Sequence, residues 1–201
     1  IKEIERRALP GVDAQTGFIG KNETVKQVLK DDLKTMHRLG VTHGQLGDDL
    51  IKVIQKARAQ GSDMFSKERV EYNGQPLSVG CSYTKGYQTS IFDNGEGWGK
   101  SLDNCVWSND FTITNLRNGL TVQVGGNVLI KEFDSNPSGG AVGVIGYIQR
   151  YGFFEGGGSK NPYRVDPMIL ADIMGRISVT DEKKLAAEIE TRKFKEGPAK
   201  K

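Results

Sequence analysis

Two histidines and two cysteines are the first side chains to consider in this sequence as a catalytic base or nucleophile. His37 and His43 are six residues apart, a spacing that matches no zinc-binding signature. Cys81 and Cys105 have no histidine near them in the sequence, and the Gly-x-Ser-x-Gly motif of serine hydrolases does not occur. We therefore predict no catalytic residue, no metal and no cofactor, and keep a hydrolase using His43 or a cysteine as an alternative.

Two glycine-rich segments with large aromatic side chains are typical of a binding site rather than of catalysis. Residues 93–107 and residues 147–158 combine flexible backbone with rings that offer apolar contact area. An arginine and a glutamate in the second segment can add directed hydrogen bonds. We expect both segments to be loops that lie at one end of a sheet and line a shared groove. The predicted binding residues are Trp98, Trp107, Tyr147, Arg150, Tyr151 and Glu155.

A second alternative is nucleic-acid binding through a helical pair at residues 23–60. Residues 38–46 resemble the turn of a helix-turn-helix motif, with a glycine between two amphipathic helices. Asp48 and Asp49 would then stand in the early turns of the recognition helix, where carboxylates repel phosphate. The net charge is only +3, and it is spread evenly along the chain. Nucleic acid is therefore the weaker prediction.

The first zone of the chain, residues 1–61, has the pattern of helices. Apolar residues recur every three or four positions between Val25 and Leu39, and again between Leu46 and Ala57. Asn22 is the expected N-cap of the first helix, and Thr42 begins the second with the spacing of a capping box. We expect a helical pair that packs on the rest of the protein.

The middle zone, residues 62–165, has the pattern of antiparallel strands. Aromatic and β-branched residues alternate with turns, and Asn-Gly at 73–74 and at 118–119 predicts two hairpins with type I′ turns. Val128–Phe133 is expected to form a further strand. Ala141–Ile148 is expected to return as a buried strand. These strands suit a small sandwich or a partly open barrel.

The last zone, residues 166–201, is expected to be helical with a frayed tail. Asp166 before Pro167 is a strong start signal, and the charged stretch from Thr180 to Lys195 predicts a final helix. The predicted fold class is α+β, with the terminal helices packed on the β-domain. We expect the following residues to be largely buried: Leu29, Leu33, Leu50, Ile54, Ile113, Val122, Ile130, Val144, Ile148 and Ile173.

The composition limits the class of protein. The chain has 201 residues, of which 36% are hydrophobic, and its longest apolar run is far too short for a membrane span. Two cysteines in a chain of this length fit a reducing compartment, so we expect a cytoplasmic location. The prediction that best fits all these patterns is a non-catalytic module that binds a small ligand or a protein through the loops of its β-domain.

Overall fold

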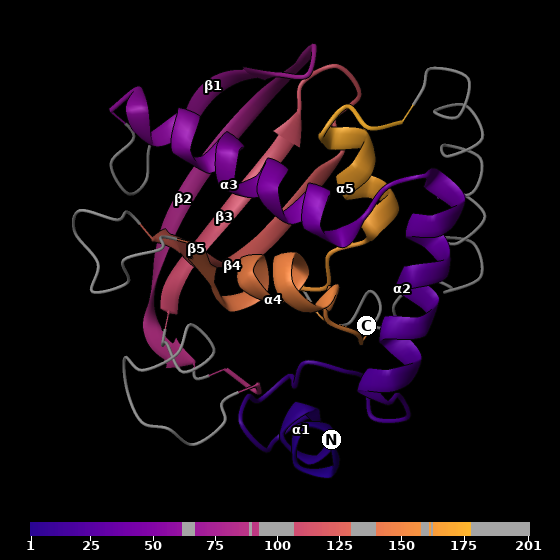
Figure 1. Cartoon of the computed structure of the whole chain (residues 1–201). Coiled ribbons are helices and arrows are strands. Elements are labelled where there is room, and N and C mark those ends of the chain that lie inside the picture. The colour runs from indigo at the N-terminus through magenta and orange to yellow at the C-terminus, as the bar shows by residue number, and fades with distance from the viewer. Residues whose placement is uncertain are drawn as a thin grey trace, which may run out of the picture.

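The protein has the α+β architecture expected from its sequence (Figure 1). The computed structural model describes residues 1–61, 67–88, 90–92, 107–129, 140–157, 161 and 163–177. The helices are α1 (Lys2–Ala8), α2 (Val25–Leu39), α3 (His43–Ala59), α4 (Gly143–Tyr151) and α5 (Pro167–Ile173). The strands are β1 (Lys67–Tyr72), β2 (Gln75–Gln88), β3 (Trp107–Asn115), β4 (Thr121–Leu129) and β5 (Gly140–Val142), which pair antiparallel in the order β1-β2-β3-β4-β5.

Helices α3, α4 and α5 cover one face of this sheet and lie in front of the strands in Figure 1, while α2 packs against α5. Side chains that point toward the helices are buried, such as Val79 and Ile113, whereas Arg69 and Thr112 on the other face are exposed. This alternation is characteristic of an antiparallel sheet with one solvated face. In the part of the chain that the structure describes, the strands form a single sheet, and helices rather than a second sheet cover it.

The two Asn-Gly pairs produce different turns. Asn73 and Gly74 both have positive φ, as a type I′ turn requires, and they connect β1 to β2 as predicted. The β3–β4 hairpin also forms, but its turn is a four-residue loop in which Gly119 has a positive φ and Asn118 does not. The predicted type I′ turn is wrong here, since the hairpin closes between Asn115 and Leu120 and leaves a longer loop, from which the Asn118 amide donates to the Asp172 carboxylate of α5.

The predicted strand at Ala141–Ile148 is also wrong. Only β5, at its start, is extended, and α4 begins at Gly143, where φ is +70°. A short run of apolar residues that is buried on all sides suits a strand and a buried helix equally well, so its pattern could not distinguish them. Helix α4 packs closely on α3. The two backbones are so near one another at Gly47 that a Cβ added there would lie only 2.5 Å from the Cα of Gln149.

Helix α2 begins later than predicted, and the face that it buries differs from the face predicted from the sequence. Its N-cap is Thr24, whose hydroxyl accepts from the backbone N–H of Gln27, rather than Asn22. Asp32 is turned inward by an ion pair with Arg164. Leu33, the next position round the helix, is therefore 58% exposed, contrary to prediction.

Most of the remaining core prediction is confirmed. Leu50, Ile54, Ile113, Val122, Val144, Ile148 and Ile173 are buried in a cluster shared by the sheet and the helices, and Leu29 packs against it half-buried. The Thr42 capping box and the Asp166 N-cap before Pro167 are also as predicted. Ile130 and the final helix predicted at Thr180–Lys195 lie outside the described residues.

Candidate binding surfaces

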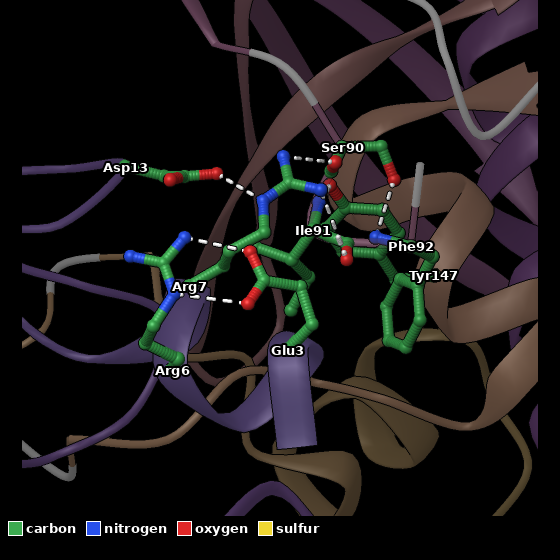
Figure 2. A network of polar contacts seen from close by, with 8 residues as sticks. All are labelled: Glu3, Arg6, Arg7, Asp13, Ser90, Ile91, Phe92 and Tyr147. Carbon is green, nitrogen blue, oxygen red and sulfur yellow. Dashed lines mark hydrogen bonds and ion pairs between the residues drawn. The ribbon is translucent and has the colours of Figure 1, made fainter. Parts of the chain in front are cut away.

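Tyr147, one of the predicted binding residues, lies in the core of the protein. Its ring packs edge-on against Phe18 and Phe92, with centroid separations of 6.2 and 5.0 Å. Its hydroxyl accepts a hydrogen bond from the backbone N–H of Ile91 at 3.3 Å (Figure 2). Burial raises the pKa of this phenol well above its usual range. Tyr147 is placed to hold the protein together rather than to meet a ligand.

Tyr151 lies one turn further along α4 and is partly accessible. The residue is 37% exposed, and its ring stacks on Phe92, with centroids 4.4 Å apart. The neighbouring Arg150 donates from Nη1 to the backbone oxygen of Ala141 at 2.8 Å, and its Nε and Nη2 atoms are buried. The first part of the segment at 147–158, predicted to be a loop, is thus helix, with Tyr151 the partly exposed ring on it.

Glu155 lies in a buried polar cluster between α4 and α5. Asn161 donates to its carboxyl group at 2.8 Å. The guanidinium of Arg164 donates to the Glu155 backbone oxygen and pairs with Asp32 on α2. Burial raises the pKa of Glu155 to about 8, with a smaller contribution from the charge of Asp110. The residue also has a positive φ of 62°, which is uncommon for a side chain of this kind.

The raised pKa of Glu155 predicts that stability falls as the pH rises from about 4.5 to about 8. Over this range the carboxyl group stays protonated in the folded protein and ionises in the unfolded chain, so unfolding releases a proton. The slope can reach about 1.4 kcal/mol per pH unit. A Glu155→Gln variant keeps an oxygen that accepts from Asn161 and loses this dependence. Urea unfolding of both proteins at pH 5, 6.5 and 8 measures the difference, and parallel pH profiles would contradict the prediction.

The remaining predicted binding residues are the two tryptophans. Trp98 lies outside the described residues, and Trp107 is placed as the first residue of β3, opposite Gln88, without a description of its side chain. Their role in binding stays a prediction. Phe92, the residue that packs on both Tyr147 and Tyr151, was not predicted, because a single phenylalanine before a glycine-rich stretch carries no signal of the contact it makes.

The residues of the hydrolase alternative lie far apart where the structure describes them. His43 is at the start of α3, and its Nδ1 donates to the backbone oxygens of Ile148 and Gln149 at 3.2 and 3.0 Å. Cys81 lies near the other end of this helix, where the Arg58 charge lowers its pKa less than burial raises it. Fifteen residues of helix separate these ends by about 22 Å. His43 and Cys81 therefore cannot act on one another, while Cys105 lies outside the described ranges.

The helical pair considered for nucleic-acid binding contributes much of its second helix to the core. The apolar face of α3 is buried against α4 and the sheet. Asp49 is 0% exposed, accepts from Nε and Nη2 of Arg176 at 2.7 Å each, and accepts from the Tyr72 hydroxyl at 2.7 Å. Asp48 is exposed and accepts from the side chain of Gln149. Of the two carboxylates expected to repel phosphate, only Asp48 faces solvent.

A hollow of about 450 Å³ lies at the turn end of β1, β2 and β3. Arg69 and Glu71 of β1 lie two residues apart on the solvated face, and Pro76 lies opposite Glu71 in the register of the strands. Leu116, the first residue of the β3–β4 loop, is held beside Pro76 by a backbone hydrogen bond of 2.8 Å and is 41% exposed. The hollow thus combines two opposite charges with an apolar wall. No pattern in the sequence predicts this hollow, because none indicates that Leu116 stays exposed.

The comparisons with known proteins add no functional information. No family model, no curated protein and no solved structure matches this chain. None of the helices that the structure describes is both long and apolar enough to cross a membrane.

Proposed function

We propose that the protein is a non-catalytic binding module that takes its ligand at the hollow between the β1–β2 turn and the β3–β4 loop. The observation that carries this proposal is an exposed leucine, Leu116, beside two opposite charges in a concavity of about 450 Å³. Ligand sites commonly have volumes of about 300–1,000 Å³. Loops on a rigid sheet are a frequent location for them, since loops can vary without unfolding the scaffold.

The lining indicates the chemistry of the ligand. Pro76 and Leu116 offer an apolar wall, which suits an aliphatic side chain. Arg69 can pair with a carboxylate, and Glu71 can pair with an ammonium group. A short peptide with an aliphatic side chain next to its charged ends has all three groups. Because Arg69 and Glu71 are exposed, each ion pair adds little, and we expect weak binding.

The experiment is an NMR titration of the full chain with the dipeptide Leu-Leu and with its acetylated, amidated form, which lacks both terminal charges. We expect the charged dipeptide to shift the backbone signals of Glu71 and Leu116, and the blocked form to bind more weakly. An Arg69→Gln variant should lose about two- to fivefold in affinity, as is typical of an exposed ion pair. A Leu116→Ala variant should also bind more weakly, because the apolar wall is smaller.

Lys67→Gln is the matched control for Arg69→Gln. Lys67 lies on the same strand and the same face, two residues before Arg69, but does not line the hollow. Its replacement removes the same charge and should leave the affinity unchanged. Equal losses in the two variants would show that net charge, and not the hollow, determines binding. Signals that shift only near Tyr151 would place the site on α4 instead and overturn the proposal.

A further inference from the structure

Arg7 connects the N-terminal arm, residues 1–24, to residues 90 and 91, which lie between β2 and β3. Arg7 of α1 donates from Nη2 to the backbone oxygen of Ser90 at 2.8 Å and from Nη1 to that of Ile91 at 3.5 Å. Its Nε donates to the carboxylate of Asp13 at 2.6 Å, which holds the guanidinium in place from within the arm. Figure 2 shows this arginine reaching from α1 to the segment at 90–92.

The segment that Arg7 holds is packed on its other side by the aromatic core. The backbone N–H of Ile91 donates to the hydroxyl of Tyr147, and that of Phe92 donates to the Ser90 hydroxyl. The ring of Phe92 then lies against Tyr147 and Tyr151. Three residues are thus held between the arm and α4.

The arm has further attachments to the body of the protein, among them the carboxylate of Glu23, which accepts from the backbone N–H of Gly157 at 2.7 Å. The carboxylate of Glu5 accepts from the backbone N–H groups of Val25 and Lys26, at 2.7 and 3.1 Å, and so caps the first turn of α2. Phe18 inserts its ring beside Tyr147, and its backbone oxygen accepts from Gly156. Helix α1 has only seven residues, too few for a helix that is stable by itself. Its conformation therefore depends on these attachments.

We infer that residues 1–24 form a strap that opens as a single unit and that the Arg7 contacts hold closed. Opening of the strap uncovers Tyr147 and frees the segment at 90–92. These attachments belong to one short piece of chain, and helix α1 within it is too short to persist undocked. Loss of the Arg7 contacts therefore weakens the docking of Glu5 and Phe18 as well. Proteins commonly open in such cooperative units at a lower free energy than global unfolding. A ligand that binds only the open form would draw the strap away from the core.

Native-state hydrogen exchange of the full chain tests this inference with an Arg7→Met variant. The strap predicts that the amides of Ile91 and Phe92 exchange at least tenfold faster than in the unmodified protein. It also predicts the same factor at Val25 and Lys26, on the far side of the arm. The amide of Leu50, in the core of α3, should exchange no faster than expected from the free energy of global unfolding measured in urea.

Arg6→Met is the matched control. Arg6 is the neighbouring residue, and it pairs with Glu3 on the exposed side of the same helix. Its replacement should change none of these exchange rates by more than about twofold, because an exposed ion pair contributes little. If Arg7→Met does not fold, Asp13→Asn keeps the arginine and weakens only the support from within the arm. It should accelerate the same four amides by a smaller, common factor.

Two results would overturn the inference. Faster exchange confined to Ile91 and Phe92 would show that Arg7 makes a local contact and that the arm does not open as a unit. Equal acceleration at Leu50 would show that the arm unfolds only with the whole protein. In both cases residues 1–24 are a fixed part of the fold.

Discussion

Replacing Asp49 by alanine is expected to destabilise the protein by about 2–3 kcal/mol, because the buried Tyr72 hydroxyl loses its acceptor and the Arg176 guanidinium loses its charged partner. Asp49 is fully buried on α3 and is the shared acceptor of Arg176 and Tyr72. Alanine leaves the guanidinium and the phenol without the charge they surround. In a protein of this size the melting temperature should fall by about 10 °C. Thermal and urea unfolding measure the effect.

Asp48→Ala is the control for this prediction. Asp48 is the preceding residue on the same helix, and it accepts one exposed hydrogen bond from Gln149. Its replacement should change stability by less than about 1 kcal/mol, as is usual at the surface. Similar effects of the two substitutions would show that the contacts of Asp49 add nothing to stability. Replacing Asp49 and Arg176 together should cost less than the sum of the single changes. Once Asp49 is gone, Arg176 has lost its carboxylate partner, so replacing Arg176 as well costs little more.

The second large effect is expected for Tyr147→Ala, at about 3–5 kcal/mol. The ring of Tyr147 is fully buried among Phe18, Phe92 and Phe153, so truncation leaves a ring-sized cavity. It also removes the acceptor of the Ile91 N–H group. The change should appear in urea unfolding as a lower midpoint with an unchanged slope.

Tyr151→Ala is the matched substitution one turn further along α4. Tyr151 is partly exposed and loses chiefly its stack on Phe92, which is worth about 0.5–1.5 kcal/mol. We therefore expect at most half the effect of Tyr147→Ala. A loss equal to that of Tyr147→Ala would place Tyr151 among the residues of the core. It would also remove Tyr151 as a candidate for contact with a ligand.

The local structure of this protein was the part best predicted from its sequence. The Thr42 capping box, the Asp166-Pro167 helix start and the Asn73-Gly74 turn form as expected, because each involves hydrogen bonds or φ angles within four residues. The α+β class followed from the change in hydrophobic period near residue 62. These features depend on residues that are close together in the chain, so the sequence is enough to predict them.

The exposure of the proposed site residues could not be predicted, because it depends on which face of each element is covered. Tyr147, Arg150, Tyr151 and Glu155 were grouped by their closeness in sequence, yet Tyr147 and Glu155 are buried and Tyr151 is partly exposed. One turn of helix decides this difference, and residues 141–148 gave no sign that a helix would form. The hollow beside Leu116 was missed for the same reason, since exposure is set by packing between distant segments.

The sequence alone determined where α3 and α5 begin and where β1 turns into β2, because these caps and this turn are satisfied locally. The tertiary structure decided how those elements face one another. Asp32 turns inward because Arg164, more than a hundred residues away, pairs with it, and Leu33 is exposed as a consequence. The β3–β4 hairpin closes with a longer loop than predicted, from which the Asn118 amide donates to Asp172 on α5. A buried charge or amide must find a partner wherever the fold offers one. That partner lies far away in sequence, so its effect on orientation appears only in the folded chain.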